Sequence, residues 1–122
     1  MGAVGRPGAL RIAALLLILS GITHLLQLLV YGWAGHVIAA AAFGAVYLVL
    51  GVGVLRKRPW GLLGASVLPL VGGVLGVYRF CFLQANPFSF FHVAIDLVVV
   101  PIVAREVLSA RAKRAGPSPP RQ

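Results

Sequence analysis

Four long apolar stretches, separated by short links, account for most of this chain. They cover residues 9–33, 36–55, 60–80 and 88–104. A helix needs about 20 mostly apolar residues to cross the hydrocarbon core of a bilayer, and each stretch is near that length. The links are too short to hold further elements, so successive helices should run in opposite directions. The sequence therefore predicts an all-α fold, a four-helix transmembrane bundle with up-down-up-down topology.

The composition indicates that lipid is the solvent around these helices. Hydrophobic residues make up 60% of the 122 positions and charged residues 11%, whereas a soluble domain carries roughly 25% charged residues. A chain this short has too little interior to bury so many apolar side chains. A signal peptide over the first stretch is disfavoured, because the apolar run continues without a small-residue cleavage site.

The basic residues gather on one side of the predicted membrane. All but Arg79 flank the stretches on that side: Arg6, Arg11, Arg56, Lys57, Arg58, Arg105, Arg111, Lys113, Arg114 and Arg121. The positive-inside rule assigns this side to the cytoplasm, so a multi-pass cell-membrane protein with both termini cytoplasmic is expected. Residues 1–8 form the N-terminal segment. Residues 105–122 form a basic tail, with disorder expected at its Gly- and Pro-rich end. Anionic lipid headgroups are the expected partner of these charges, and a nucleic-acid role is disfavoured because topology already accounts for them.

Small residues on the second and third stretches predict where helices pack most closely. Inside lipid, helices associate through close backbone approach, which glycine permits. Gly44 and Gly51 lie on the second stretch, and Gly72 and Gly76 form a GxxxG pair on the third. These two helices are expected to form the tight centre of the bundle. The same GxxxG pair serves self-association equally well, so a homo-oligomer or a subunit of a membrane complex is expected.

Polar residues inside the apolar stretches mark a candidate site on the non-basic side. The first helix carries a stripe of polar residues at three- and four-residue spacing, and on the fourth helix His92 and Asp96 lie one turn apart. Exposing either stripe to lipid would cost free energy, so the two stripes should face each other. The predicted outward-opening cluster consists of His24, Gln27, Tyr31, Tyr78, Arg79, His92 and Asp96.

Three interpretations of this cluster stay open. In the first, Asp96 accepts from Arg79 or from a protonated histidine and clasps the helices together. In the second, His24 and His92 hold a metal ion or haem in a redox protein, with His36 or Asp96 as a further ligand. In the third, the cluster binds a quinone, lipid or other small molecule, or passes protons or a solute as a minimal transporter. No nucleophile–base or phosphate-loop motif occurs, so no catalytic residue is assigned and a non-catalytic subunit or binding module is favoured over an enzyme.

Three short segments carry a family resemblance. Gly21-Ile22-Thr23-His24-Leu25 in the first stretch, Arg56-Lys57-Arg58-Pro59-Trp60 after the second, and Asp96 in the fourth resemble small four-span membrane proteins of the DoxX-like kind and related prokaryotic families. Some DoxX-type proteins are associated with membrane redox complexes and quinone. The resemblance therefore implies an accessory redox role, and it assigns no catalytic residue.

Overall fold

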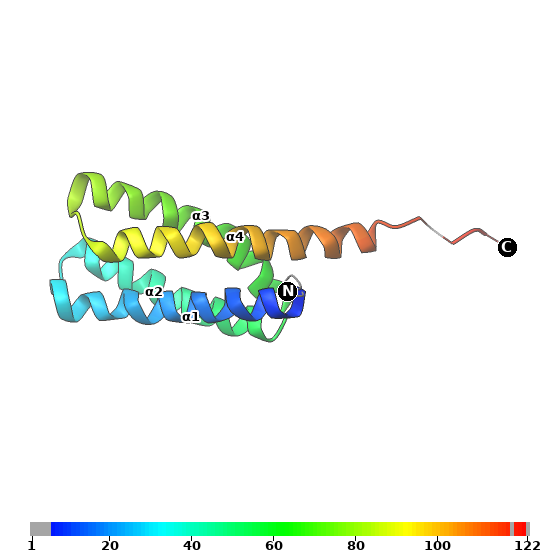
Figure 1. Cartoon of the computed structure of the whole chain (residues 1–122), viewed down its shortest axis with the longest axis horizontal. Helices are drawn as coiled ribbons and strands as arrows, with labels where there is room; N and C mark the ends of the chain where they lie inside the picture. Colours follow the sequence, from blue (N-terminus) through cyan, green and yellow to red (C-terminus); the bar gives the residue numbers. More distant parts are fainter. Residues whose placement is uncertain (1–5, 118, 122) are drawn as a thin grey trace, which may run out of the picture.

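The fold is an all-α four-helix bundle, seen in a computed structural model that describes residues 6–117 and 119–121 (Figure 1). The elements are α1 (Arg6–Tyr31), α2 (Gly35–Leu55), α3 (Pro59–Tyr78), the π-helix η1 (Arg79–Leu83) and α4 (Pro87–Arg114). The predicted fold class is confirmed. α1, α2, α4 and the continuous run Pro59–Leu83 are each long and apolar enough to cross a membrane. The chain is thus a small multi-pass membrane protein.

The helices run up and down, and the two ends of the bundle differ in chemistry. The α2–α3 turn with Arg56, Lys57 and Arg58 lies at one end, which we call the basic end. The α1–α2 and α3–α4 links lie at the opposite end, here called the histidine end (Figure 1). At the basic end α4 projects beyond its neighbours, so the tail predicted from residue 105 starts as a continuation of the helix.

The termini differ in part from the predicted boundaries. α1 begins at Arg6, so residues 6–8 of the predicted N-terminal segment are helical, whereas residues 1–5 lie outside the described residues. α4 ends at Arg114, and Gly116 and Pro117 carry no helix. Positions 118 and 122 are also outside the description. The disorder expected of this tail stays a prediction.

Proline and asparagine explain where the last two membrane helices begin. Arg58 is extended, as a residue before proline prefers, and Pro59 opens α3, where its missing N–H costs nothing. Asn86 caps α4: its side-chain oxygen accepts from the backbone N–H of Ser89 at 2.8 Å, and Pro87 occupies the first turn. The cap places His92 and Asp96 at a defined height in the bundle.

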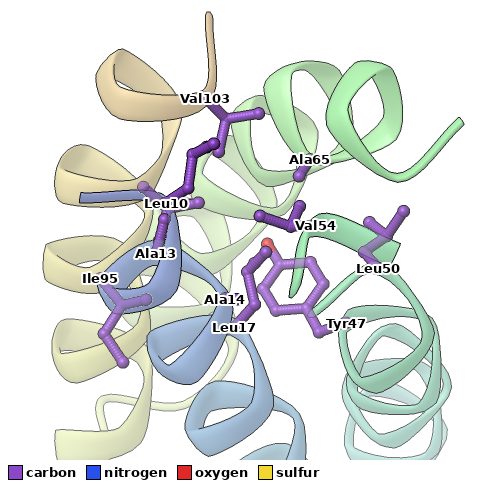
Figure 2. Close-up of a cluster of buried hydrophobic side chains, with 11 residues drawn as sticks. Leu10, Ala13, Ala14, Leu17, Tyr47, Leu50, Val54, Ala65, Ile95 and Val103 are labelled. Carbon is purple, nitrogen blue, oxygen red and sulfur yellow. The ribbon is translucent and has the colours of Figure 1, made fainter. Parts of the chain in front are cut away.

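The apolar core fills the half of the bundle toward the basic end. Figure 2 shows side chains from all four helices converging there. The cluster consists of Leu10, Ala13, Ala14, Leu17, Tyr47, Leu50, Val54, Ala65, Ile95, Val99 and Val103. Many large apolar side chains point outward instead, among them Leu29, Val74 and Phe82. In water that surface would be costly, and in a bilayer it is the expected exterior.

The most extensive helix packing is between α1 and α2, which corrects the expectation that α2 and α3 form the tight centre. A Cβ on Gly44 would lie 2.5 Å from the Cβ of His24, and one on Gly51 would lie 2.6 Å from Ile18 Cγ1. Both glycines therefore face α1. Small residues lie all around α2, and composition alone did not reveal which face each one occupies.

The two glycines predicted on the third stretch have different neighbours. A Cβ on Gly72 would meet the hydroxyl of Tyr47 on α2, whereas one on Gly76 would lie 3.2 Å from Val93 on α4. The α2–α3 contact is close at the basic end, where a Cβ on Gly61 would lie 2.5 Å from the carbonyl carbon of Gly53. Both glycines of the GxxxG pair therefore pack within one chain, and self-association stays a prediction.

Candidate functional site

At the histidine end, α3 continues into the π-helix η1, and Arg79 at this junction is buried inside the bundle. The backbone N–H of Gln84 donates to the carbonyl of Arg79 at 2.7 Å, which closes a five-residue π turn. Such π insertions recur at functional sites. Arg79 lies inside the bundle with 7% of its surface exposed, whereas Phe80 and Phe82 of the same turn point outward.

Neutral groups surround the guanidinium of Arg79. Its Nη1 donates to Oε1 of Gln27, and its Nη2 donates to Oε1 of Gln84 at 3.2 Å. The Tyr31 ring lies 5.8 Å from the Cζ of Arg79, within the range of a cation–π contact. The Nε is buried and has no hydrogen-bond partner among the described residues. Arg79 is thus a buried cation held by amides and an aromatic ring.

The polar stripes of α1 and α4 meet at two histidines. The rings of His24 and His92 stack with centroids 3.6 Å apart and 21° between their planes. The Thr23 hydroxyl lies 2.7 Å from His92 Nε2, and the Gln27 amide nitrogen lies 3.4 Å from His24 Nδ1. The stacked rings and the Thr23–His92 contact therefore join the first and last helices, and Gln27, which accepts from Arg79, also contacts His24.

Asp96 has a hydrogen-bond partner that is neither Arg79 nor a histidine. The hydroxyl of Tyr47 donates to Asp96 Oδ1 at 3.1 Å, and both side chains are buried. The interpretation in which Asp96 accepts from Arg79 or a histidine is corrected, because the side chain that donates to it is Tyr47 of α2. A signal was present: a tyrosine in the middle of an apolar helix needs a partner for its hydroxyl at that depth.

The remaining predicted residues lie at the edge of the cluster. His36 Nε2 lies 3.2 Å from Gln84 Oε1, so the third histidine contacts the arginine's acceptor and not the histidine pair. Tyr31 meets Phe88 edge-on at 5.8 Å, and Tyr78 is half exposed. Thr23, Tyr47 and Gln84 belong to the network although they lie outside the predicted cluster.

The cluster opens onto a cavity of about 240 Å³. Its polar walls come from His24, His36, Arg79 and His92, and its apolar walls include Phe43, Leu75 and Leu83. Gly72 and Gly76 leave space on the α3 side. The arrangement offers hydrogen-bond donors and one positive charge to a molecule in an otherwise apolar setting.

The geometry does not favour the metal or haem interpretation. Within residues 6–117 and 119–121, no three or more His, Cys, Asp and Glu side chains gather where they could hold a metal ion. His24 and His92 contact each other face to face, so no macrocycle fits between them as axial ligands would require. The arrangement is that of a hydrogen-bonded site around a cation.

Comparison of the chain with protein-family models, with curated proteins and with solved structures gives no match. The DoxX-like resemblance therefore stays a prediction.

Replacing Tyr47 with phenylalanine is expected to lower the free energy of unfolding by about 1–2 kcal/mol, because Asp96 would lose its donor. Thermal unfolding in detergent micelles, followed by circular dichroism, measures the change. Tyr78→Phe is the matched control, since that tyrosine is half exposed. Equal melting temperatures for the two variants would contradict the importance of the Tyr47–Asp96 bond.

Proposed function

We propose that this protein is a non-catalytic membrane module that binds a small molecule through an oxygen acceptor, either anionic or carbonyl, placed against Arg79 in the histidine-end cavity. One observation carries the proposal. A buried guanidinium, whose Nε has no hydrogen-bond partner among the described residues, lines a cavity, and its hydrogen-bonded neighbours are neutral amides.

The positive charge of Arg79 has no acidic partner in the part of the bundle that the structure describes, which supports a ligand that supplies an oxygen acceptor. A buried cation is costly unless an acceptor of negative charge or high polarity faces it. The chain has two acidic residues, Asp96 and Glu106. Asp96 is engaged by Tyr47, and Glu106 lies far along α4 toward the basic end. Arginine is the side chain best shaped to hold carboxylate, phosphate or paired carbonyl oxygens.

The cavity's size indicates which part of the ligand it holds. Its volume of about 240 Å³ is below the roughly 300 Å³ at which pockets begin to enclose a whole drug-sized molecule. A headgroup or a single ring fits, with an apolar tail left among the helices or in lipid. A quinone ring and a fatty-acid carboxylate share this chemistry, and the DoxX-like resemblance favours the quinone and an accessory redox role.

Location and assembly belong to the same proposal. The basic residues support placement in the cell membrane with both termini cytoplasmic and the histidine end outward. The exposed basic residues at the end of α4 are placed to contact anionic headgroups. Function as a homo-oligomer or within a membrane complex would suit a module without catalytic groups.

Titration with two probes of equal chain length tests the proposal: a decyl-substituted benzoquinone and decanoate, each added to purified protein in nanodiscs of neutral lipid. Arg79→Gln is expected to lower the affinity for the preferred probe at least about tenfold, because one charge-assisted hydrogen bond is lost. Arg111→Gln, which removes an exposed arginine of α4, is the matched control and should bind like the wild type.

Isothermal titration calorimetry measures both affinities. The probe whose affinity falls in Arg79→Gln shows whether Arg79 binds a carbonyl or a carboxylate oxygen. If Arg79→Gln and Arg111→Gln bind both probes as the wild type does, the proposal is wrong.

A further inference from the structure

A second cavity, of about 540 Å³, opens between α3 and α4 on the outer surface of the bundle. Its walls include Pro69, Leu70 and Val74 of α3 and Leu97 and Pro101 of α4. Leu97 and Val74 are strongly exposed, so the groove faces the surrounding lipid. A volume of this size is within the range of small-molecule sites.

The groove exists because its two helices place small or rigid residues opposite each other. Pro69 and Pro101 lie inside α3 and α4 and have short rings in place of long side chains. Gly73 has no side chain at all, and it lies next to the carboxyl of Asp96: a Cβ on Gly73 would be 3.6 Å from Asp96 Oδ2. The floor of the groove at that point is therefore the aspartate.

Asp96 presents one oxygen to the bundle and the other to the groove. Oδ1 accepts from Tyr47, whereas Oδ2 receives no hydrogen bond from the described residues. At about 1.5 Å per residue, Asp96 lies about 14 Å along α4 from Pro87, close to the middle of a bilayer. Few waters reach that depth, so the ionised carboxylate is stable there only when another molecule supplies a donor to its second oxygen.

We infer that this groove binds a membrane-dissolved amphiphilic amine, whose ammonium donates to Asp96 Oδ2 and whose hydrocarbon chain lies along the apolar walls. A cation supplies both the donor and the charge that a carboxylate needs inside lipid. The protein's own cation at the histidine end, Arg79, is held by Gln27 and Gln84 and lines the other cavity.

A second copy of this chain fits the groove less well. The exposed side chains at the middle of the helices outside the groove walls, such as Val49 and Val71, are aliphatic. A copy docking through such a surface would cover Asp96 Oδ2 without giving it a donor. The groove's chemistry therefore selects a ligand with a nitrogen headgroup.

Dodecylamine tests the inference, with dodecanoate as the probe of opposite charge. Native mass spectrometry of the protein in nanodiscs of neutral lipid counts the molecules bound per chain. One amine is expected per wild-type chain. Asp96→Asn should lower the affinity for the amine about 10- to 100-fold, since a hydrogen bond to a charged group is lost.

Gly73→Ala provides a second variant that does not touch the carboxyl. The added methyl makes ordinary contact with Asp96 Oδ2, so the fold should be kept while the approach to that oxygen is closed. Gly35→Ala is the matched control, because a Cβ there meets nothing within 4 Å. The Gly73→Ala protein should no longer bind the amine, whereas the Gly35→Ala protein should bind it as the wild type does.

Three results would overturn the inference: amine uptake unchanged in both Asp96→Asn and Gly73→Ala, dodecanoate bound as tightly as dodecylamine, or a groove already closed by a second copy. The last would appear as a disulfide between Leu97→Cys chains in a Cys81→Ser background, with no amine taken up. The inference is independent of the proposed function, since Arg79→Gln should bind dodecylamine as the wild type does.

Discussion

Replacing Gly44 with alanine is expected to destabilise the bundle by about 3 kcal/mol, the upper end of the usual cost of overpacking. The new Cβ would lie 2.5 Å from the Cβ of His24 and 2.8 Å from the carbonyl oxygen of Gly21. Neither atom belongs to a flexible side-chain end, so α1 and α2 must separate to make room. Separation would also pull His24 away from His92 and open the histidine pair.

Thermal unfolding in micelles measures this loss, and two further glycine variants calibrate it. Gly35→Ala should be neutral or slightly stabilising, because alanine favours helix and the site is open. Gly51→Ala should cost less than Gly44→Ala, since its nearest neighbour is the side chain of Ile18, which can move. A Gly44→Ala protein as stable as Gly35→Ala would contradict the close α1–α2 packing.

Replacing Gln27 with leucine is expected to destabilise the bundle by about 2–3 kcal/mol, because it removes an acceptor from a buried charged donor. Gln27 is fully buried, and it joins Arg79 of η1 to His24 of α1. Leucine has nearly the same volume, so the change removes the hydrogen bond more than the packing. The guanidinium would then keep Gln84 as its hydrogen-bonded neighbour.

A double-mutant cycle separates this bond from general damage to the core. Replacing both partners by apolar residues can be nearly neutral, so Gln27→Leu combined with Arg79→Leu should be more stable than Gln27→Leu alone. Melting temperatures of the four proteins in one detergent give the coupling energy. Strictly additive losses would show that Gln27 and Arg79 do not depend on each other.

The arrangement keeps the two buried charged side chains apart. Arg79 and Asp96 line different cavities, and each is bonded to neutral groups of the protein. Had the two formed one ion pair, neither cavity would offer an unsatisfied charge. The separation is what allows the two proposed ligands, an oxygen acceptor and an amine, to be tested independently.

The α1–α2 packing and the partner of Asp96 show where reasoning from the sequence failed. The tight centre was expected between α2 and α3, but Gly44 and Gly51 face α1. One interpretation paired Asp96 with a cation, but Asp96 accepts from Tyr47. In each case the side chain's depth was available from residue count, whereas the rotation of the helix about its axis was not.

The amino-acid sequence by itself determined the number of helices, their alternating directions and the half of the bundle that holds the histidines. These follow from the length of apolar runs and from residue counting along a helix, both of which are local properties. Only the tertiary structure decided that His24 stacks on His92, that a π turn brings Arg79 inside, and that Asp96 lies at the floor of a groove. Those contacts depend on how four helices rotate and slide to fit their side chains together, which no single segment specifies.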